Sequence, residues 1–128
     1  MPSSEVSELN EIISDEEFLF RGVLKINWNN RENRISSSAF KDSQGCSVDR
    51  CNFRNHNDVA NSIFVKKDFF TVAKIQTLNV RSVPTKVKYL PVEDNPYHSE
   101  IHDEENRIQL RPSKAKKISK QVEIIHKT

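Results

Sequence analysis

Short segments in which polar and apolar residues alternate are the feature that most constrains the fold of this chain. Such segments are found at residues 18–26, 34–40, 69–78, 86–90 and 98–102. Alternation with a period of two is typical of half-buried β-strands, whereas helical spacing of apolar residues occurs around residues 1–14, 57–64 and 113–125. A doubly wound parallel sheet needs regular alternation of strands and helices, so this order predicts an α+β fold. We expect a single small domain with a mostly antiparallel sheet, one short internal helix and a C-terminal amphipathic helix.

The size and composition of the chain limit its core and its location. A chain of 128 residues is enough for one compact domain. Hydrophobic residues make up 35% of it and charged residues 30%, so we expect a thin core with a strongly solvated surface. No apolar run approaches the roughly 20 residues that span a bilayer, and the N-terminus is acidic where a signal peptide is basic and then apolar. We therefore expect a cytoplasmic protein with no membrane partner.

The formal net charge of +2 conceals a gradient along the chain. Residues 1–17 carry six acidic side chains and no basic one, whereas residues 107–128 carry seven Lys or Arg and one Glu. We therefore divide the chain into an acidic N-terminal arm at residues 1–17, an α+β core domain at residues 18–104 and a basic C-terminal helix at residues 105–128. Residues 1–14 and roughly 113–128 each carry one narrow apolar stripe, so we expect these two segments to be more mobile than the sheet.

Turn and capping residues predict how the segments connect. The polar turn at residues 27–30 suggests that strands 18–26 and 34–40 pair as a hairpin. Gly45 is the residue expected at positive φ, at the start of a loop that runs to Asn57. Asn57 and Asp58 are suited to cap the internal helix, and Ser113 the C-terminal one. The apolar stripe of the C-terminal helix comprises Ala115, Ile118, Val122 and Ile125.

Two clusters contain residue types that can bind metals. Cys46, Cys51 and His56 offer zinc ligands, but structural zinc needs four ligands at shorter spacings, so we interpret both cysteines as free thiols. His98, Glu100 and His102 would share one side of a strand, where they could hold a divalent metal or transfer a proton. An edge of ordinary solvated side chains is the simpler interpretation of the second cluster, and no metal site is predicted.

A third cluster is suited to an anionic ligand. In the predicted hairpin, Arg21 lies near Ser36, Ser37 and Ser38 and not far from Asp42, and arginine with hydroxyl groups suits a phosphate or carboxylate. His98 follows Asn95 and Pro96, a step that proline makes rigid. We expect Arg21, Ser37, Asp42 and His98 to converge on one ligand, with His98 and Asp42 as the candidate catalytic residues.

The chain also resembles a family of small bacterial proteins of uncharacterised function. The resemblance spans about residues 18–102 and is carried by Ser37-Ser38-Ala39-Phe40-Lys41-Asp42, by Ser47-Val48 and by Asn95-Pro96-Tyr97-His98-Ser99-Glu100-Ile101. It names no reaction. It implies a common site that includes Arg21, Ser37, Phe40, Asp42, Ser47, Asn95, Pro96 and His98, and it adds Ser47 and Asn95 to the candidate ligand-binding residues.

Three functions are compatible with these features, and the sequence leaves the oligomeric state open. With only two glycines and no glycine-rich phosphate loop, a P-loop enzyme is excluded and no cofactor is expected. The leading prediction is a small bacterial accessory or protein-interaction module that acts with larger operon-encoded partners. The alternatives are a small enzyme or nucleotide-handling domain with the Arg/Ser/Asp/His anion site, and nucleic-acid binding by the C-terminal helix. The helix residues that would contact nucleic acid are Arg111, Lys114, Lys116, Lys117 and Lys120.

Overall fold

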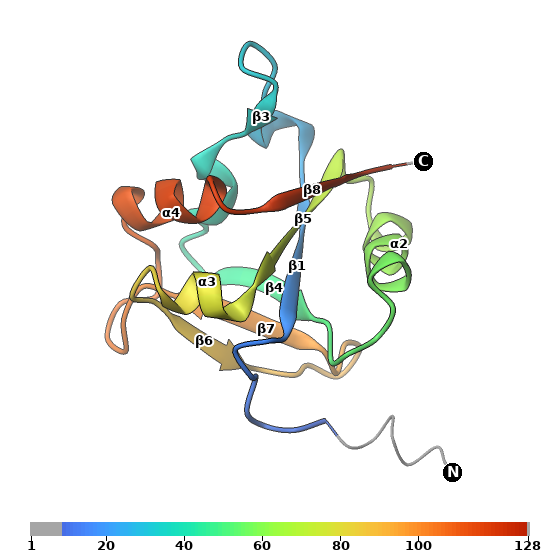
Figure 1. Cartoon of the computed structure of the whole chain (residues 1–128), viewed down its shortest axis with the longest axis vertical. Coiled ribbons are helices and arrows are strands. Elements are labelled where there is room, and N and C mark those ends of the chain that lie inside the picture. Colours follow the sequence, from blue (N-terminus) through green and yellow to red (C-terminus); the bar gives the residue numbers. More distant parts are fainter. Residues whose placement is uncertain (1–8, 128) are drawn as a thin grey trace.

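A six-stranded antiparallel sheet dominates the computed structural model, which describes residues 9–127 (Figure 1). The strands are β1 (Phe18–Val23), β4 (Cys46–Arg50), β5 (Thr71–Gln76), β6 (Lys86–Tyr89), β7 (His98–His102) and β8 (Glu123–His126). Their order across the sheet is β6-β7-β4-β1-β5-β8, and every neighbouring pair is antiparallel. The α+β prediction, with one small domain and a mostly antiparallel sheet, is confirmed.

Helices, 3-10 turns and a small hairpin complete the fold. They are η1 (Lys25–Asn27), β2 (Trp28–Asn29), β3 (Arg34–Ile35), η2 (Ser37–Phe40), α2 (His56–Lys66), α3 (Thr77–Arg81) and α4 (Pro112–Ser119). The internal helix α2 was predicted, but its cap is Asn55, whose side chain accepts a hydrogen bond from the Asp58 N–H at 3.1 Å. Residues 9–127 contain no helix long and apolar enough to cross a bilayer.

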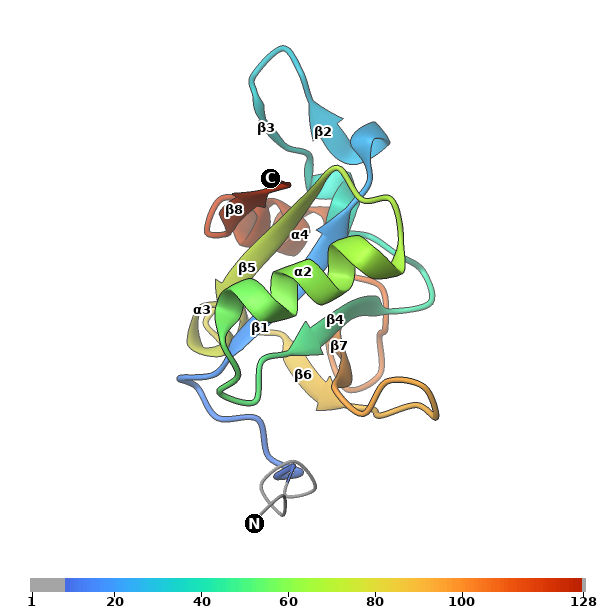
Figure 2. The same cartoon turned by 90° about the vertical axis from the view of Figure 1, so that its right-hand side faces the viewer.

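The core lies on both faces of the sheet. Helix α2 packs against β1 and β5 on one face, and η2 and α4 lie on the other (Figures 1 and 2). Leu19 and Phe20, neighbours on β1, therefore point into opposite halves of the core, and each is almost fully buried. This two-sided burial explains how a chain with few apolar residues stabilises one domain.

The predicted hairpin between residues 18–26 and 34–40 is wrong. Strand β1 pairs with β4 and β5 instead, while residues 34–35 pair with residues 28–29. The serine run turns into η2 because the Ser36 side chain accepts a hydrogen bond from the Ser38 N–H at 3.2 Å, and such local bonds compete with strand pairing.

The predicted loop after Gly45 contains a central strand. Gly45 does have positive φ, at 117°, as expected, and β4 begins at the next residue. The alternation of Cys46, Val48 and Arg50 on the buried side was missed because Arg50 is charged. Its charge is compensated by Glu17, as described below.

The C-terminal segment is more than a helix. Helix α4 ends at Ser119, and its buried residues Ala115 and Ile118 match the predicted stripe. Val122 and Ile125, predicted on the same helix, lie instead just after the turn that ends α4 and in β8, because the β-branched residues 124–125 pair with β5. The cap position is Arg111 rather than Ser113, since Pro112 occupies the first helical turn.

Part of the predicted acidic arm packs on the sheet. Residues 1–8 lie outside the described residues, and residues 9–14 form no helix. Glu17 is buried and makes a two-point ion pair with the buried Arg50, at 2.8 Å for each contact. Arg81 binds the Asp15 carboxylate and the Ile13 carbonyl oxygen, each at 2.7 Å. The acidic residues nearest the core therefore have structural roles.

Candidate functional site

Five of the predicted site residues line one pocket of about 330 Å³, which we call the first pocket. It lies beside α2, where β1, β4 and the start of β7 meet the turn after η2. The five residues are Arg21, Asp42, Ser47, Asn95 and His98. Ser37 does not line it, because η2 carries the serine run elsewhere. Phe40, which the family resemblance implied, is a core residue.

Arg21 connects three parts of the pocket wall. The β1–β4 register ends at Phe20 and Asp49. Beyond that point the Arg21 side chain bridges the strands: Nε donates to the Ala39 carbonyl at 2.7 Å, and Nη1 donates to the Ser47 carbonyl at 2.6 Å. Its Nη2 group makes no hydrogen bond within residues 9–127. Arg21 therefore holds the wall together, and its third guanidinium nitrogen has no partner among the described residues.

A polar set on β4 and the loop before β7 forms the second wall. Asn95 Nδ2 donates to Asp49 Oδ1 at 2.8 Å, and Lys66 Nζ lies 3.9 Å from Asp49 Oδ2. Asn95 Oδ1 also accepts from the Tyr97 N–H at 3.0 Å, which fixes the rigid step predicted before His98. Asp49 is thus positioned by two partners and is only partly available to a ligand.

His98 enters the pocket from β7 beside a carboxylate. Its Nε2 lies 3.3 Å from Glu100 Oε2, and Glu100 Oε1 lies 2.8 Å from His102 Nε2. The prediction that these three side chains share one side of a strand is confirmed, although β7 is flanked by β4 and β6 and is not an edge. Within residues 9–127 they form no group suited to hold a metal ion. A carboxylate that orients an imidazole in this way can support proton transfer.

The cysteine cluster is dispersed. Cys46, on β4, and Cys51, the residue after β4, are free and buried, and they belong to the two core clusters on opposite faces of the sheet. Burial raises the pKa of the Cys46 thiol to about 11 and also raises that of Cys51. His56 packs on the rings of Phe18 and Phe20, with centroid distances of 4.9 and 5.4 Å. Both thiols are therefore protonated at neutral pH.

Two of the five basic residues predicted to bind nucleic acid are bonded within the fold. Arg111 donates to Asp103 at 2.7 Å and to Glu104 at 2.6 Å. Lys114 donates to the Pro84 carbonyl oxygen at 2.8 Å. The remaining lysines of the set, Lys116, Lys117 and Lys120, are exposed. The helix therefore offers fewer cations than the sequence suggested.

Sequence reasoning missed the cations and the ring that complete the first pocket. Lys66 and Lys67 reach it from the end of α2, and Phe69 forms part of its apolar wall. Gly22 gives Phe69 room, since a Cβ at residue 22 would lie 2.5 Å from the Phe69 ring. A lone glycine inside a strand signals such a close approach, so Gly22 could have been singled out.

Comparisons with known proteins found no relative of this chain. The chain matches no protein-family model, no curated protein and no solved structure. The resemblance to a small bacterial family stays a prediction, and so does the existence of operon-encoded partners.

Proposed function

We propose that this protein is a binding module whose first pocket holds a small molecule with an anionic group. The observation that carries the proposal is the convergence of Arg21, Asp42, Ser47, Asn95 and His98, from separate parts of the chain, on one pocket. Its volume of about 330 Å³ falls within the range of about 300–1,000 Å³ that is common for small-molecule sites.

The residues that line the first pocket suit a ligand that combines an anionic group with an aromatic or apolar part. Arg21 and Lys67 form no ion pair within residues 9–127, so their charges are available to a phosphate or carboxylate. Phe69, which is half-buried, supplies apolar surface on the side of α2, and the buried Phe20 and Ile63 also line the pocket. A nucleoside monophosphate combines these two properties, which makes AMP a suitable probe.

The test compares AMP with adenosine and with inorganic phosphate by calorimetry. Lys67→Ala is the informative variant because Lys67 is exposed and its side chain makes no hydrogen bond to any described residue. We expect it to weaken AMP binding about tenfold, the loss of about 1.4 kcal/mol, and Lys116→Ala on α4 is the charge-matched control. Equal affinity in both variants, or no binding of any probe, would contradict the proposal.

One observation favours a second function, the protein-interaction module that the sequence suggested first. Phe53 is 74% exposed and adopts φ of 60°, a conformation rare for a bulky residue. Aromatic residues, Phe included, are enriched at protein–protein interfaces, and strained backbone conformations cluster at functional sites. Phe53→Ser should abolish specific capture of a partner, while Val65→Ser, at an even more exposed site on α2, should not.

A further inference from the structure

A second pocket adjoins the first and shares one of its residues. Its volume is about 390 Å³, and it lies between the start of β5 and the end of β8. Its lining residues are Lys25, Asp68, Phe69, Phe70, His126 and Lys127. Because Phe69 also lines the first pocket, a ligand that passes this residue can occupy both.

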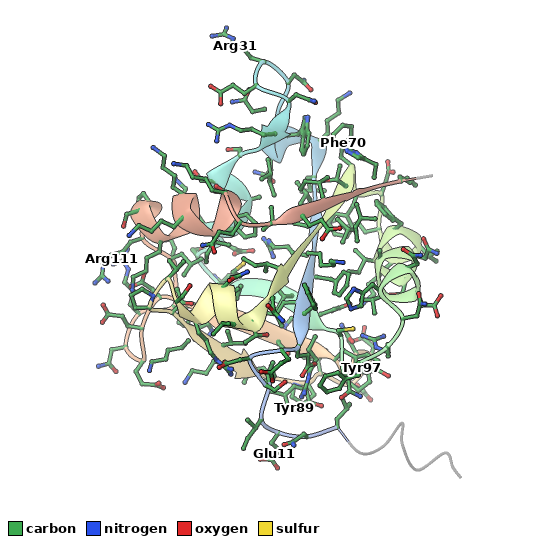
Figure 3. The ribbon with its side chains drawn as sticks, viewed as in Figure 1. Glu11, Arg31, Phe70, Tyr89, Tyr97 and Arg111 are labelled. Carbon is green, nitrogen blue, oxygen red and sulfur yellow. The ribbon has the colours of Figure 1, made fainter. Side chains whose placement is uncertain are left out.

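Lysines and aromatic rings are paired across the surface that joins the two pockets. Lys67 Nζ lies 5.6 Å from the centre of the Phe69 ring, and Lys25 Nζ lies 6.0 Å from that of Phe70. Lys127 is placed in the same way, 5.9 Å from Phe64. Figure 3 shows Phe70 at the end of the sheet where the β2–β3 hairpin projects. Proteins that bind single-stranded nucleic acids combine basic side chains with aromatic rings, because the bases stack on the rings and the phosphates contact the basic side chains.

The charge of the two linings is complementary to a polyanion. Five Lys or Arg side chains line the pockets, against three carboxylates. Two of the carboxylates already have partners, because Asp49 pairs with Lys66 and Asp68 with Lys127. Arg21, Lys25 and Lys67 form no ion pair within residues 9–127. The excess positive charge is spread over both pockets, so more than one phosphate can be held.

We propose that the two pockets together bind a short single-stranded nucleic acid. One phosphate lies in the first pocket near Arg21 and Lys67, and a neighbouring base lies against Phe69 or Phe70 in the second. A single strand is required because the rings can stack only on bases that are not paired in a duplex. This proposal rests on the proposed function, since it assigns the anion of the first pocket to a nucleic-acid backbone.

The single tryptophan provides a direct readout of the second pocket. Trp28 lies 5.5 Å from the Phe70 ring and 6.1 Å from the His126 ring, and it is the only tryptophan in the chain. Titration with 5′-phosphorylated hexathymidylate should change its fluorescence. Thymidine monophosphate, which fills only the first pocket, should bind about tenfold more weakly and leave the emission nearly unchanged.

A pair of double variants isolates the second pocket from general electrostatics. Lys25→Ala with Lys127→Ala should weaken hexathymidylate binding about tenfold, lower the salt dependence by roughly one to two units and leave AMP binding unchanged. The control, Lys116→Ala with Lys117→Ala, removes the same charge from exposed positions on α4 and should change little.

The outcomes separate this inference from the proposed function. If the mononucleotide and the oligonucleotide bind equally well, or if both double variants lose affinity equally, the nucleic-acid inference is wrong and the small-molecule pocket stands. Equal affinity for a duplex also overturns the inference. A third outcome is that the Lys25→Ala, Lys127→Ala double variant weakens oligonucleotide binding as expected while Lys67→Ala leaves it unchanged. The first pocket is then not the anion site, and both proposals are wrong in their present form.

Discussion

At the residue scale, the pair formed by Glu17 and Arg50 shows how a charged residue enters the centre of a sheet. Both side chains are 1% exposed, and the Arg50 guanidinium also lies 4.7 Å from the centre of the Tyr89 ring. Glu17 Oε2 accepts a further bond from the Asn52 N–H at 2.7 Å. The carboxylate thus connects the segment before β1 to the end of β4.

Removal of the Glu17 charge should therefore destabilise the whole domain. Glu17→Gln leaves Arg50 buried without a counter-charge, a change that typically costs about 3–5 kcal/mol. Glu16→Gln, at the exposed neighbouring position, should shift stability by less than about 0.5 kcal/mol. Urea unfolding of the two variants measures the difference. Similar midpoints would show that the ion pair does not stabilise the fold.

Gly22 links packing to binding at a single position. Gly22→Ala places a Cβ within 2.5 Å of the Phe69 ring, so the ring must move out of the wall that both pockets share. We expect a loss of about 1–3 kcal/mol in stability, typical of overpacking, together with weaker ligand binding. Adding Phe69→Leu to Gly22→Ala should restore part of the stability but not the binding, measured by thermal unfolding and calorimetry. Unchanged binding in Gly22→Ala would place the ligand away from Phe69.

At the element scale, Asp103 fixes the start of α4 beyond the end of β7. Its buried carboxylate accepts bonds from the Arg111 N–H at 2.9 Å and from the Arg111 guanidinium at 2.7 Å, and Lys114 lies nearby (Arg111 is labelled in Figure 3). Burial by itself raises the pKa of Asp103, but the Arg111 N–H and the charges of Lys114 and Arg111 outweigh burial and hold the pKa below its ordinary value of 3.8.

This lowered pKa gives the contribution of Asp103 a definite pH dependence. On acidification the unfolded chain takes up the proton first, so the stabilisation is complete well above pH 3.8 and is lost as the pH falls through the pKa of the folded state. Asp103→Asn should lower the free energy of unfolding by about 1–3 kcal/mol at pH 7. Near pH 3 the free energies of unfolding of the variant and of the unsubstituted chain should differ by less. Urea unfolding at both pH values measures it, and a constant difference would contradict the assignment.

The helices and strands that could be predicted from the sequence are those with a clear pattern of polar and apolar residues within their own bounds. Strands β1, β5, β6 and β7 and helix α2 each carry a clear local pattern, whereas the pairing of β1 and the existence of β4 depend on residues far along the chain. Strand β4 was not predicted because Arg50 interrupts its apolar pattern, and Glu17, which compensates the charge of Arg50, is 33 residues away in the sequence. The same limit applies to the site: Arg21, Asp42 and His98 were predicted to converge, but Lys66 and Lys67 join them only through the packing of α2 on β1.

At the scale of the whole molecule, we expect the described parts of both ends to belong to the same cooperative unit as the sheet. The sequence divided the chain into two charged ends and a core, yet Ile13 contributes to the same buried cluster as Leu19, Ala115 and Ile118. Strand β8 adds the last edge of the sheet through its pairing with β5. Substitution of Arg21 should also lower the stability of the domain, because two of its nitrogens hold carbonyl groups of η2 and β4.

Hydrogen exchange should reveal this unit directly. Because Ala115 and Ile118 are fully buried and residues 123–126 pair with β5, we expect the amides of the second half of α4, and those of β8 that face β5, to exchange nearly as slowly as those of β5 itself. Residues 105–106, at the exposed tip of the turn after β7, serve as the fast reference in the same experiment. In Ile118→Ala, which removes a fully buried side chain at a cost of about 2–5 kcal/mol, protection should fall in β5 as well as in α4. A loss of protection confined to residues 112–126 would show instead that the C-terminal segment opens independently of the sheet.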